Sequence, residues 1–213
     1  MCWILIAALS VTQNSPASEQ NAGEPRVITV LGDSLTAGYG VDRAEAYPAL
    51  LQKQITAAGW NFTVVNAGQN GDTTAAGLQR LDWLLQRRIH VLILALGGND
   101  GLRGIDPAVT KTNLQTIITR AKQKYPDIQI VLAGMKMSPN MGLGYLNRFG
   151  AIYPELATQN KLALVPFLLE GVGGRPELNQ DDLIHPTVEG QEILAKNVWR
   201  VLQPLLRAMV AAP

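Results

Sequence analysis

The sequence predicts a doubly wound α/β fold, in which a parallel sheet is covered by helices on both faces. Two observations lead to this prediction. Five short runs rich in Val, Ile and Leu recur along the chain, and amphipathic segments with helical spacing separate them. A strand that is followed by a helix and then by another strand forms a right-handed crossover between parallel neighbours. The alternation therefore leaves few possible topologies.

The predicted strands span residues 27–31, 62–65, 91–96, 128–133 and, more weakly, 162–165. Runs without polar alternation are typical of parallel strands buried on both faces. A five-stranded, flavodoxin-like sheet between two helical layers is the natural arrangement, and the loops after its strands gather at one edge. Ligands bind at that edge in open α/β sheets, so reactive side chains in those loops are candidate site residues.

The predicted helices span residues 47–58, 73–88, 107–125, 147–160 and 186–209. Pro48 and Pro107 lie in first turns, where the missing N–H costs nothing, and Asp106 precedes Pro107 as a helix cap. Asp72 or Thr73 is the expected cap of the second helix. Pro154 predicts a kink or a break within the fourth helix.

Composition excludes several classes of function. The 213 residues carry a formal charge of +1 with dispersed basic residues, which gives no electrostatic footprint for nucleic acid. The single cysteine excludes an intramolecular disulfide, and one cysteine with two histidines makes a structural zinc site unexpected. We expect no metal and no cofactor; the sequence leaves the oligomeric state open, with a monomer favoured.

Residues 1–25 form a segment separate from the single domain predicted for residues 26–213. Residues 2–9 are apolar but too few to span a bilayer, so no stable membrane anchor is expected. Their pattern is that of the apolar core of a secretory signal, with a cleavage motif at Ser15-Pro16-Ala17 and without a basic n-region. The segment favours a periplasmic or secreted protein, with a cytoplasmic one as the alternative.

Ser34 follows the first predicted strand in Gly32-Asp33-Ser34-Leu35 and is a candidate nucleophile. A serine hydroxyl needs an adjacent base at neutral pH, and a neutral imidazole suits that task. His185 lies on a loop before the last helix, and Asp182 is placed to orient its ring. Asp181 is a competing partner that the sequence leaves open.

An acyl transfer also needs donors for the oxyanion that develops on the carbonyl. The candidates are the backbone N–H groups of Ser34 and Gly68 and the side-chain amide of Asn99. Asp33 and Asp100 are interpreted as acceptors that brace their turns. Three methionines after the fourth strand are candidates for an adaptable acyl-binding wall: Met135, Met137 and Met141.

In their order along the chain, these segments resemble the conserved blocks of the SGNH, or GDSL-type, hydrolase family. The blocks are Gly32-Asp33-Ser34-Leu35, Gly68, Gly97-Gly98-Asn99-Asp100 and Asp182 with His185. Residues 97–104 and 181–186 look most like the bacterial thioesterase I, lysophospholipase L1 and arylesterase group. The resemblance implies a three-layer α/β/α sandwich, Ser34 as nucleophile, Gly68 and Asn99 as oxyanion donors, and Asp182 and His185 as the remaining triad residues.

Three functions fit the sequence to different degrees. A serine esterase or thioesterase would act on a small acyl ester or thioester, such as an aryl ester, a medium-chain acyl ester, an acyl-CoA or a lysophospholipid. A carbohydrate O-acetyl esterase would use the same residues on a polar substrate. A flavin- or nucleotide-binding module could share the scaffold, but no Gly-x-Gly-x-x-Gly or P-loop pattern follows the first strand.

Overall fold

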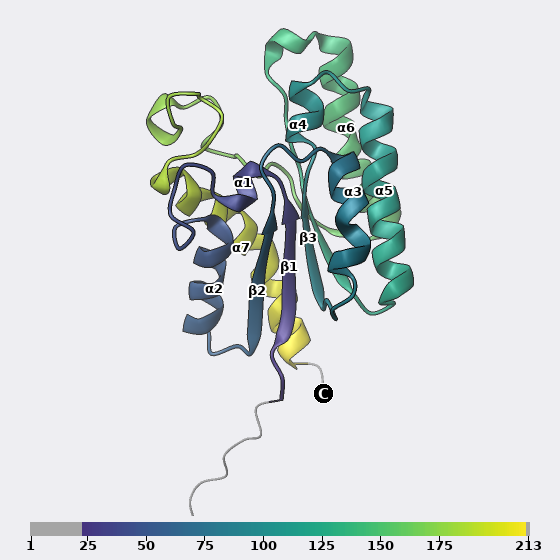
Figure 1. Ribbon diagram of the computed structural model, residues 1–213, viewed down its shortest axis with the longest axis vertical. Coiled ribbons are helices and arrows are strands. Elements are labelled where there is room, and N and C mark those ends of the chain that lie inside the picture. The colour runs from purple at the N-terminus through teal and green to yellow at the C-terminus, as the bar shows by residue number, and fades with distance from the viewer. Residues whose placement is uncertain (1–22, 212–213) are drawn as a thin grey trace, which may run out of the picture.

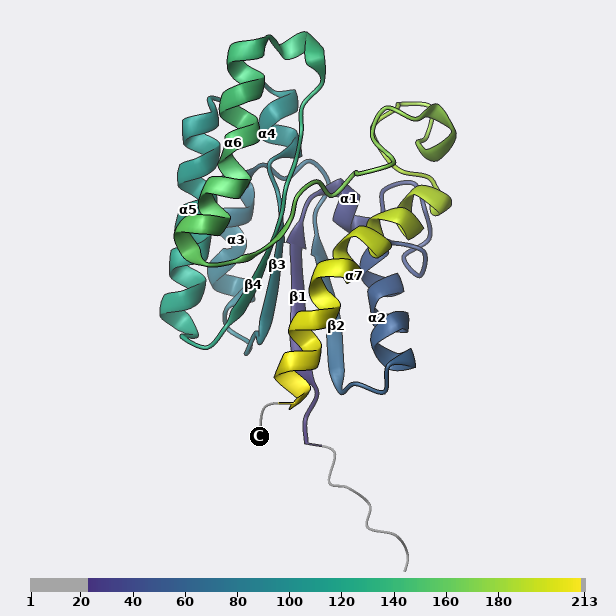
Figure 2. The same cartoon turned by 180° about the vertical axis from the view of Figure 1, so that it is seen from behind.

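The protein is described here by a computed structural model, in which residues 23–211 are placed. Five parallel strands form one sheet in the order β2-β1-β3-β4-β5. Figures 1 and 2 show β1, β2 and β3 side by side, and Figure 2 also shows β4. The strands are β1 (Arg26–Gly32), β2 (Phe62–Gly68), β3 (Val91–Ala95), β4 (Gln129–Ala133) and β5 (Ala163–Val165). The predicted flavodoxin-like topology is therefore confirmed. The strand order reverses between β1 and β3, which is where such sheets open a crevice.

Helices cover both faces of the sheet. One face carries α2 (Tyr47–Ala57) and α7 (Val188–Ala211), and the other carries α3 (Thr74–Leu84), α5 (Pro107–Lys124) and α6 (Leu143–Asn160). Four one-turn elements were not predicted: α1 (Ser34–Ala37), α4 (Gly98–Leu102), and the 3₁₀ turns η1 (Pro139–Met141) and η2 (Pro176–Leu178). A single turn has no periodic apolar pattern from which it could be predicted.

Helix boundaries differ from the sequence-based ones by more than two residues at two places. The helix α6 begins four residues before the predicted start and continues past Pro154 to Asn160. The helix α3 ends at Leu84, before the predicted end at residue 88, where Leu85 makes the closing hydrogen bond. No helix within residues 23–211 is long and apolar enough to cross a membrane.

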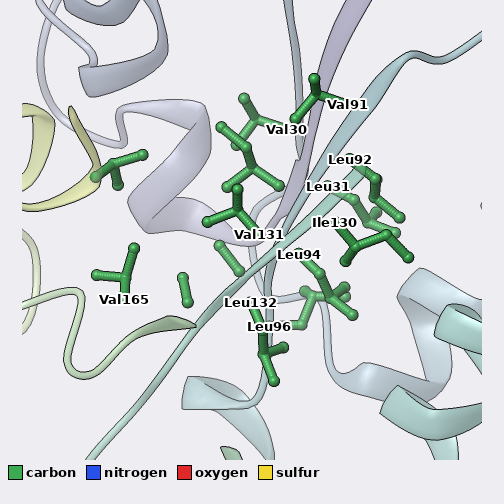
Figure 3. Packing of buried hydrophobic residues seen from close by; sticks show 14 of the residues in the cluster. Val30, Leu31, Val91, Leu92, Leu94, Leu96, Ile130, Val131, Leu132 and Val165 are labelled. Carbon is green, nitrogen blue, oxygen red and sulfur yellow. The ribbon is translucent and has the colours of Figure 1, made fainter. Parts of the chain in front are cut away.

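The core lies along both faces of the central strands. All five residues of β3 are buried, and Val30 and Leu31 of β1 have no exposed surface. Figure 3 shows Val30 and Leu31 of β1 and Leu92 and Leu94 of β3 in one core cluster with side chains of β4. Burial on both faces explains why the sequences of the strands are continuous apolar runs. The shared core also holds the carboxyl ends of the strands in fixed positions relative to one another.

The backbones of β1, β2 and α1 approach closely at the carboxyl edge of the sheet. Gly32 and Gly68 are register partners at the ends of β1 and β2. A Cβ atom at Gly68 would lie 2.3 Å from the backbone nitrogen of Ala37, and one at Gly32 would lie 1.9 Å from the Oγ1 of Thr36. The short helix that begins with Ser34 therefore packs directly on the two strand ends.

We expect Gly68→Ala to destabilise the protein by about 1–3 kcal/mol, because the added methyl group meets backbone atoms that have no room to move. Urea unfolding of the wild-type and variant proteins measures the change. Gly150→Ala is the control, since a Cβ atom at Gly150 in α6 meets nothing within 4 Å. That variant should gain up to about 1 kcal/mol from helix propensity. An unchanged midpoint for Gly68→Ala would contradict the close packing.

Candidate active site

Ser34 is the first residue of α1 and directly follows the turn at the end of β1. Asp33 caps this helix, since its Oδ1 accepts a hydrogen bond from the N–H of Leu35 at 3.0 Å. The backbone N–H of Ser34 lies in the first turn of α1, where no intrahelical acceptor is available. The sequence-based interpretation of Asp33 as an acceptor that shapes the turn is confirmed.

The imidazole of His185 lies beside the Ser34 hydroxyl, although the two residues are 151 positions apart. Its Nε2 atom is 2.9 Å from Ser34 Oγ. The short loop that carries His185 is closed by a hydrogen bond from the N–H of Gln180 to the carbonyl of His185 at 2.7 Å. The chain's other histidine, His90, is at the opposite edge of the sheet, where its Nδ1 accepts the N–H of Val27 at 2.9 Å.

Asp182 holds the other side of the His185 ring. Its Oδ2 atom accepts a hydrogen bond from His185 Nδ1 at 2.6 Å, while its Oδ1 atom accepts the N–H groups of Ile184 and His185 at 2.9 and 3.0 Å. The hydrogen bond from the His185 ring is the main cause that lowers the pKa of Asp182 to about 2, and both backbone hydrogen bonds add to it. Asp182 therefore stays ionised and fixes Nε2 as the nitrogen that faces Ser34.

Asp181, the competing partner, is exposed and makes no hydrogen bond to His185 in the part of the chain described. The structure thus brings Ser34, His185 and Asp182 together in one hydrogen-bonded series. It also adds Tyr39, which the sequence did not indicate. The Tyr39 ring lies 4.5 Å from the His185 ring, centroid to centroid, and its carbonyl accepts the side-chain amide of Gln180 at 2.7 Å.

Asn99 lies at the start of α4 and lines the same cavity as Ser34. Its Nδ2 atom donates to the carbonyl of Asp72 at 3.0 Å and is 3.4 Å from Asp33 Oδ2. Both contacts are made by the side-chain nitrogen and hold the amide beside the turn of Asp33 and Ser34. Asn99 thus lies next to Ser34, and its part as an oxyanion donor stays a prediction.

Gly68 is placed differently from the prediction. Its N–H donates to the Oδ1 of Asn66 at 2.9 Å, so it is engaged and does not face the cavity as a free donor. The reason is that β2 extends to Gly68 and the Asn66 side chain folds back along it to bond the carbonyl of Thr36 as well. The prediction of Gly68 as an oxyanion donor is therefore corrected, and its observed contribution is close packing against α1.

The next glycine on this loop, Gly71, is the better candidate donor. Its backbone is left-handed (φ +78°), and its N–H makes no hydrogen bond within residues 23–211. Gly71 directly precedes Asp72, whose carbonyl contacts Asn99. In the sequence, Gly71 and Asp72 stand directly before Thr73, the cap of α3. This placement of a glycine just before a helix cap was the signal that could have identified Gly71 as a candidate donor.

Arg80 fixes this loop to the end of β1. Its Nε forms a salt bridge with Asp72 Oδ2 at 2.6 Å, and its Nη2 donates to the carbonyl of Gly32 at 3.0 Å. Both side chains are largely buried, so the pair is shielded from solvent. Asp100 braces the same region from α4, because it accepts both the N–H and the hydroxyl of Thr74 at the start of α3. The predicted bracing role of Asp100 is confirmed.

A cavity of about 680 Å³ opens beside Ser34 and His185. Most of its lining is apolar, contributed by Leu35, Leu102, Met135, Met137, Phe167, Leu169, Leu183 and Ile184. Met135 and Met137 lie where the sequence predicts. Met141 does not line the cavity, because the chain turns through η1 (Pro139–Met141) and carries its side chain past it. Within the described residues, no group of His, Cys, Asp and Glu side chains could hold a metal ion.

A serine, a histidine and a carboxylate in hydrogen-bonded series at the carboxyl edge of a parallel α/β/α sheet define a serine hydrolase. Comparison with known proteins identifies the family. The chain belongs to the GDSL-like Lipase/Acylhydrolase family, which matches residues 30–193, and it has the SGNH hydrolase fold. It is accordingly a carboxylic ester hydrolase.

Relatives share about two fifths of its residues. The chain is 42% identical over 182 residues to Esterase TesA of Pseudomonas aeruginosa, covering 85% of this chain and 90% of that protein. It is 38% identical over 199 residues to an arylesterase of Vibrio mimicus, with coverage of 93% and 95%. It is 39% identical over 182 residues to Thioesterase 1/protease 1/lysophospholipase L1 of Escherichia coli, with coverage of 84% of each chain. A crystal structure of TesA matches with a TM-score of 0.81 at 42% identity, covering 84% of this chain and 99% of that one.

We expect Arg80→Gln to lower kcat by about tenfold or more with little change in KM, because the loop beside Asn99 loses its anchor while the cavity stays intact. Steady-state kinetics on a soluble ester give the two constants separately. Arg120→Gln is the matched control, since Arg120 forms an exposed pair with Asp82 between α5 and α3. An equal loss of kcat in both variants would indicate a general structural effect.

The buried carboxyl of Asp33 should make the free energy of unfolding depend on pH. Burial is the main cause that raises the pKa of Asp33 to about 7, so the folded protein keeps a proton that the unfolded chain releases near pH 4. This group therefore lowers stability progressively as pH rises from about 4 to about 7. In Asp33→Asn that decline should vanish, as measured by urea unfolding at about pH 4 and about pH 8. Equal declines in both proteins would argue against a buried, protonated carboxyl.

Proposed function

We propose that the protein is a serine esterase that hydrolyses aryl esters and medium-chain acyl esters through an acyl-enzyme on Ser34. The observation that carries this proposal is the series Ser34–His185–Asp182 at the mouth of a largely apolar cavity. An apolar cavity of this size suits an alkyl or aryl group with a few polar contacts. The relatives bear the names esterase, arylesterase and thioesterase/lysophospholipase, which agree with such substrates.

Catalysis begins when Ser34 Oγ attacks the carbonyl carbon of the ester and His185 Nε2 accepts the hydroxyl proton. The carbonyl oxygen becomes an oxyanion. When the tetrahedral intermediate collapses, the bond to the leaving oxygen breaks and His185 delivers the proton to it. A water molecule then attacks the acyl-enzyme, again giving a proton to His185, which returns it to Ser34 Oγ. Asp182 remains ionised throughout and stabilises the imidazolium.

Three donors stabilise the oxyanion in this proposal. They are the N–H of Ser34, the side-chain amide of Asn99 and, in place of Gly68, the N–H of Gly71. The support is positional: Asn99 lines the cavity with Ser34, and the loop of Gly71 and Asp72 is bonded to Asn99. Each such donor contributes about a hundredfold to a thousandfold to the rate.

The same residues would act on acyl-CoA thioesters or lysophospholipids, and a carbohydrate O-acetyl esterase is the second candidate. Met135, Met137 and Phe167 favour a longer or aromatic group over an acetylated sugar, since most of the surface that lines the cavity is apolar. We also propose a periplasmic or secreted location, which rests on the signal-like residues 2–9. Those residues, like most of the segment 1–25, lie outside the described part of the chain.

The decisive experiment compares two neighbouring carboxylates. Asp182→Asn should lower kcat on p-nitrophenyl butyrate by about 10³- to 10⁴-fold, because the imidazole loses its orienting anion. Asp181→Asn should leave kcat unchanged, because its side chain is exposed and not bonded to His185. Ser34→Ala should abolish turnover and the burst of acyl-enzyme formation. Full activity of Ser34→Ala would refute the mechanism. A second experiment compares the rates on esters from acetyl to dodecanoyl with the rate on an acetylated xylan, and it distinguishes an acyl-ester hydrolase from a carbohydrate O-acetyl esterase.

A further inference from the structure

Leu183 combines two unfavourable features in one residue. Its backbone is left-handed (φ +58°), which among the described non-glycine residues is shared only with Lys161. Its side chain is 59% exposed although it is fully apolar. A bulky residue in the left-handed region is uncommon, and glycine or asparagine would adopt it at less cost. The position calls for an account of what the leucine side chain does.

The loop of Asp182 and His185 holds Leu183 in this conformation. The N–H of Leu183 donates to the carbonyl of Gln180 at 2.8 Å, and the Asp182 carboxylate accepts the next two backbone N–H groups. Leu183 is therefore placed as firmly as the residues on either side of it. It lines the cavity together with Ile184 and His185.

Exposed apolar side chains lie on both sides of this cavity. Leu183 and Ile184, the latter 42% exposed, come from the loop before α7, and Leu102, 60% exposed, comes from α4 after β3. All three side chains thus line the cavity of the active site and keep apolar surface exposed to solvent. Other exposed apolar residues, such as Trp83 on α3, do not line it.

The chemistry of the triad determines where the leaving group, the oxyanion and the acyl group of the substrate lie around the carbonyl carbon. His185 Nε2 must deliver its proton to the leaving oxygen, so the leaving group lies on the imidazole side of the carbonyl carbon. The oxyanion lies toward Asn99, and the acyl group takes the remaining direction, where Met135 and Met137 line the cavity. Leu183 and Ile184 directly precede His185 and line the cavity with it, which favours the leaving-group side of the cavity for both side chains.

We propose that Leu183, together with Ile184, forms a leaving-group subsite that selects esters of apolar, aromatic alcohols. This inference rests on the proposed esterase function and adds to it the residues that contact the released alcohol and set the preference for an aromatic one. Contact with an aromatic ring removes exposed leucine surface from water, which gives the side chain at this left-handed position a function.

The test keeps the acyl group constant and changes only the alcohol. Phenyl butyrate and 2-naphthyl butyrate give the same butyryl-enzyme, so the ratio of their kcat/KM values reports the acylation step and the leaving group alone. The wild-type protein should prefer the naphthyl ester. Leu183→Asn should reduce this preference about threefold to tenfold through loss of apolar contact, and asparagine tolerates the left-handed backbone, so the fold is retained. Leu183→Met should keep the preference.

Two controls separate the subsite from general effects. Lys161→Asn changes the other left-handed residue, and Trp83→Gln removes another exposed apolar side chain, so both should keep the wild-type ratio. An unchanged ratio in Leu183→Asn would overturn the inference, as would a loss that follows acyl length across phenyl acetate and phenyl octanoate. Either result leaves the esterase function intact. That function fails separately if the wild-type protein hydrolyses neither butyrate or if Ser34→Ala retains activity.

Discussion

The burial of every central strand on both faces is the constraint from which the active site follows. Such strands must be parallel and joined by helical crossovers, so their carboxyl ends meet at one edge. The ends of β1 and β3 then carry Ser34 and Asn99 at the reversal of strand order, and the chain beyond β5 brings His185 to the same edge. Gly32 and Gly68 allow the serine helix to rest on the strand ends. Catalytic geometry is thus a product of core packing.

Two carboxylates of this edge show how environment decides the charge. Asp33 is buried beside the nucleophile, and desolvation raises its pKa to about 7. Asp182 lies at the surface, and hydrogen bonds from His185 and the backbone lower its pKa to about 2. The ionised group that orients the imidazole is therefore the accessible one, because a carboxylate in contact with water keeps its charge at little cost. The buried carboxyl serves the turn as a hydrogen-bond acceptor.

Sequence patterns predicted the sheet, its order and the association of Ser34 with Asp182 and His185, because apolar runs and the order of short blocks are local signals. They were wrong for Gly68 and Met141, since which of two nearby glycines has its N–H engaged, and where the chain turns away from the cavity, depend on tertiary contacts. Asn66 and η1 supply those contacts here. Nothing in the sequence indicated the anchoring by Arg80, whose partners Asp72 and Gly32 are 8 and 48 residues away.

The base and its carboxylate lie three residues apart on one closed loop, whereas the nucleophile is the first residue of α1, just after the end of β1. A rigid displacement of that loop would leave the Asp182–His185 pair intact and change a single catalytic distance, the one from Nε2 to Ser34 Oγ. Activation of the nucleophile in this fold consequently depends on that one distance. The response of catalysis to temperature, solvent or crowding would then reflect how tightly the loop of Asp182 and His185 packs beside the end of β1.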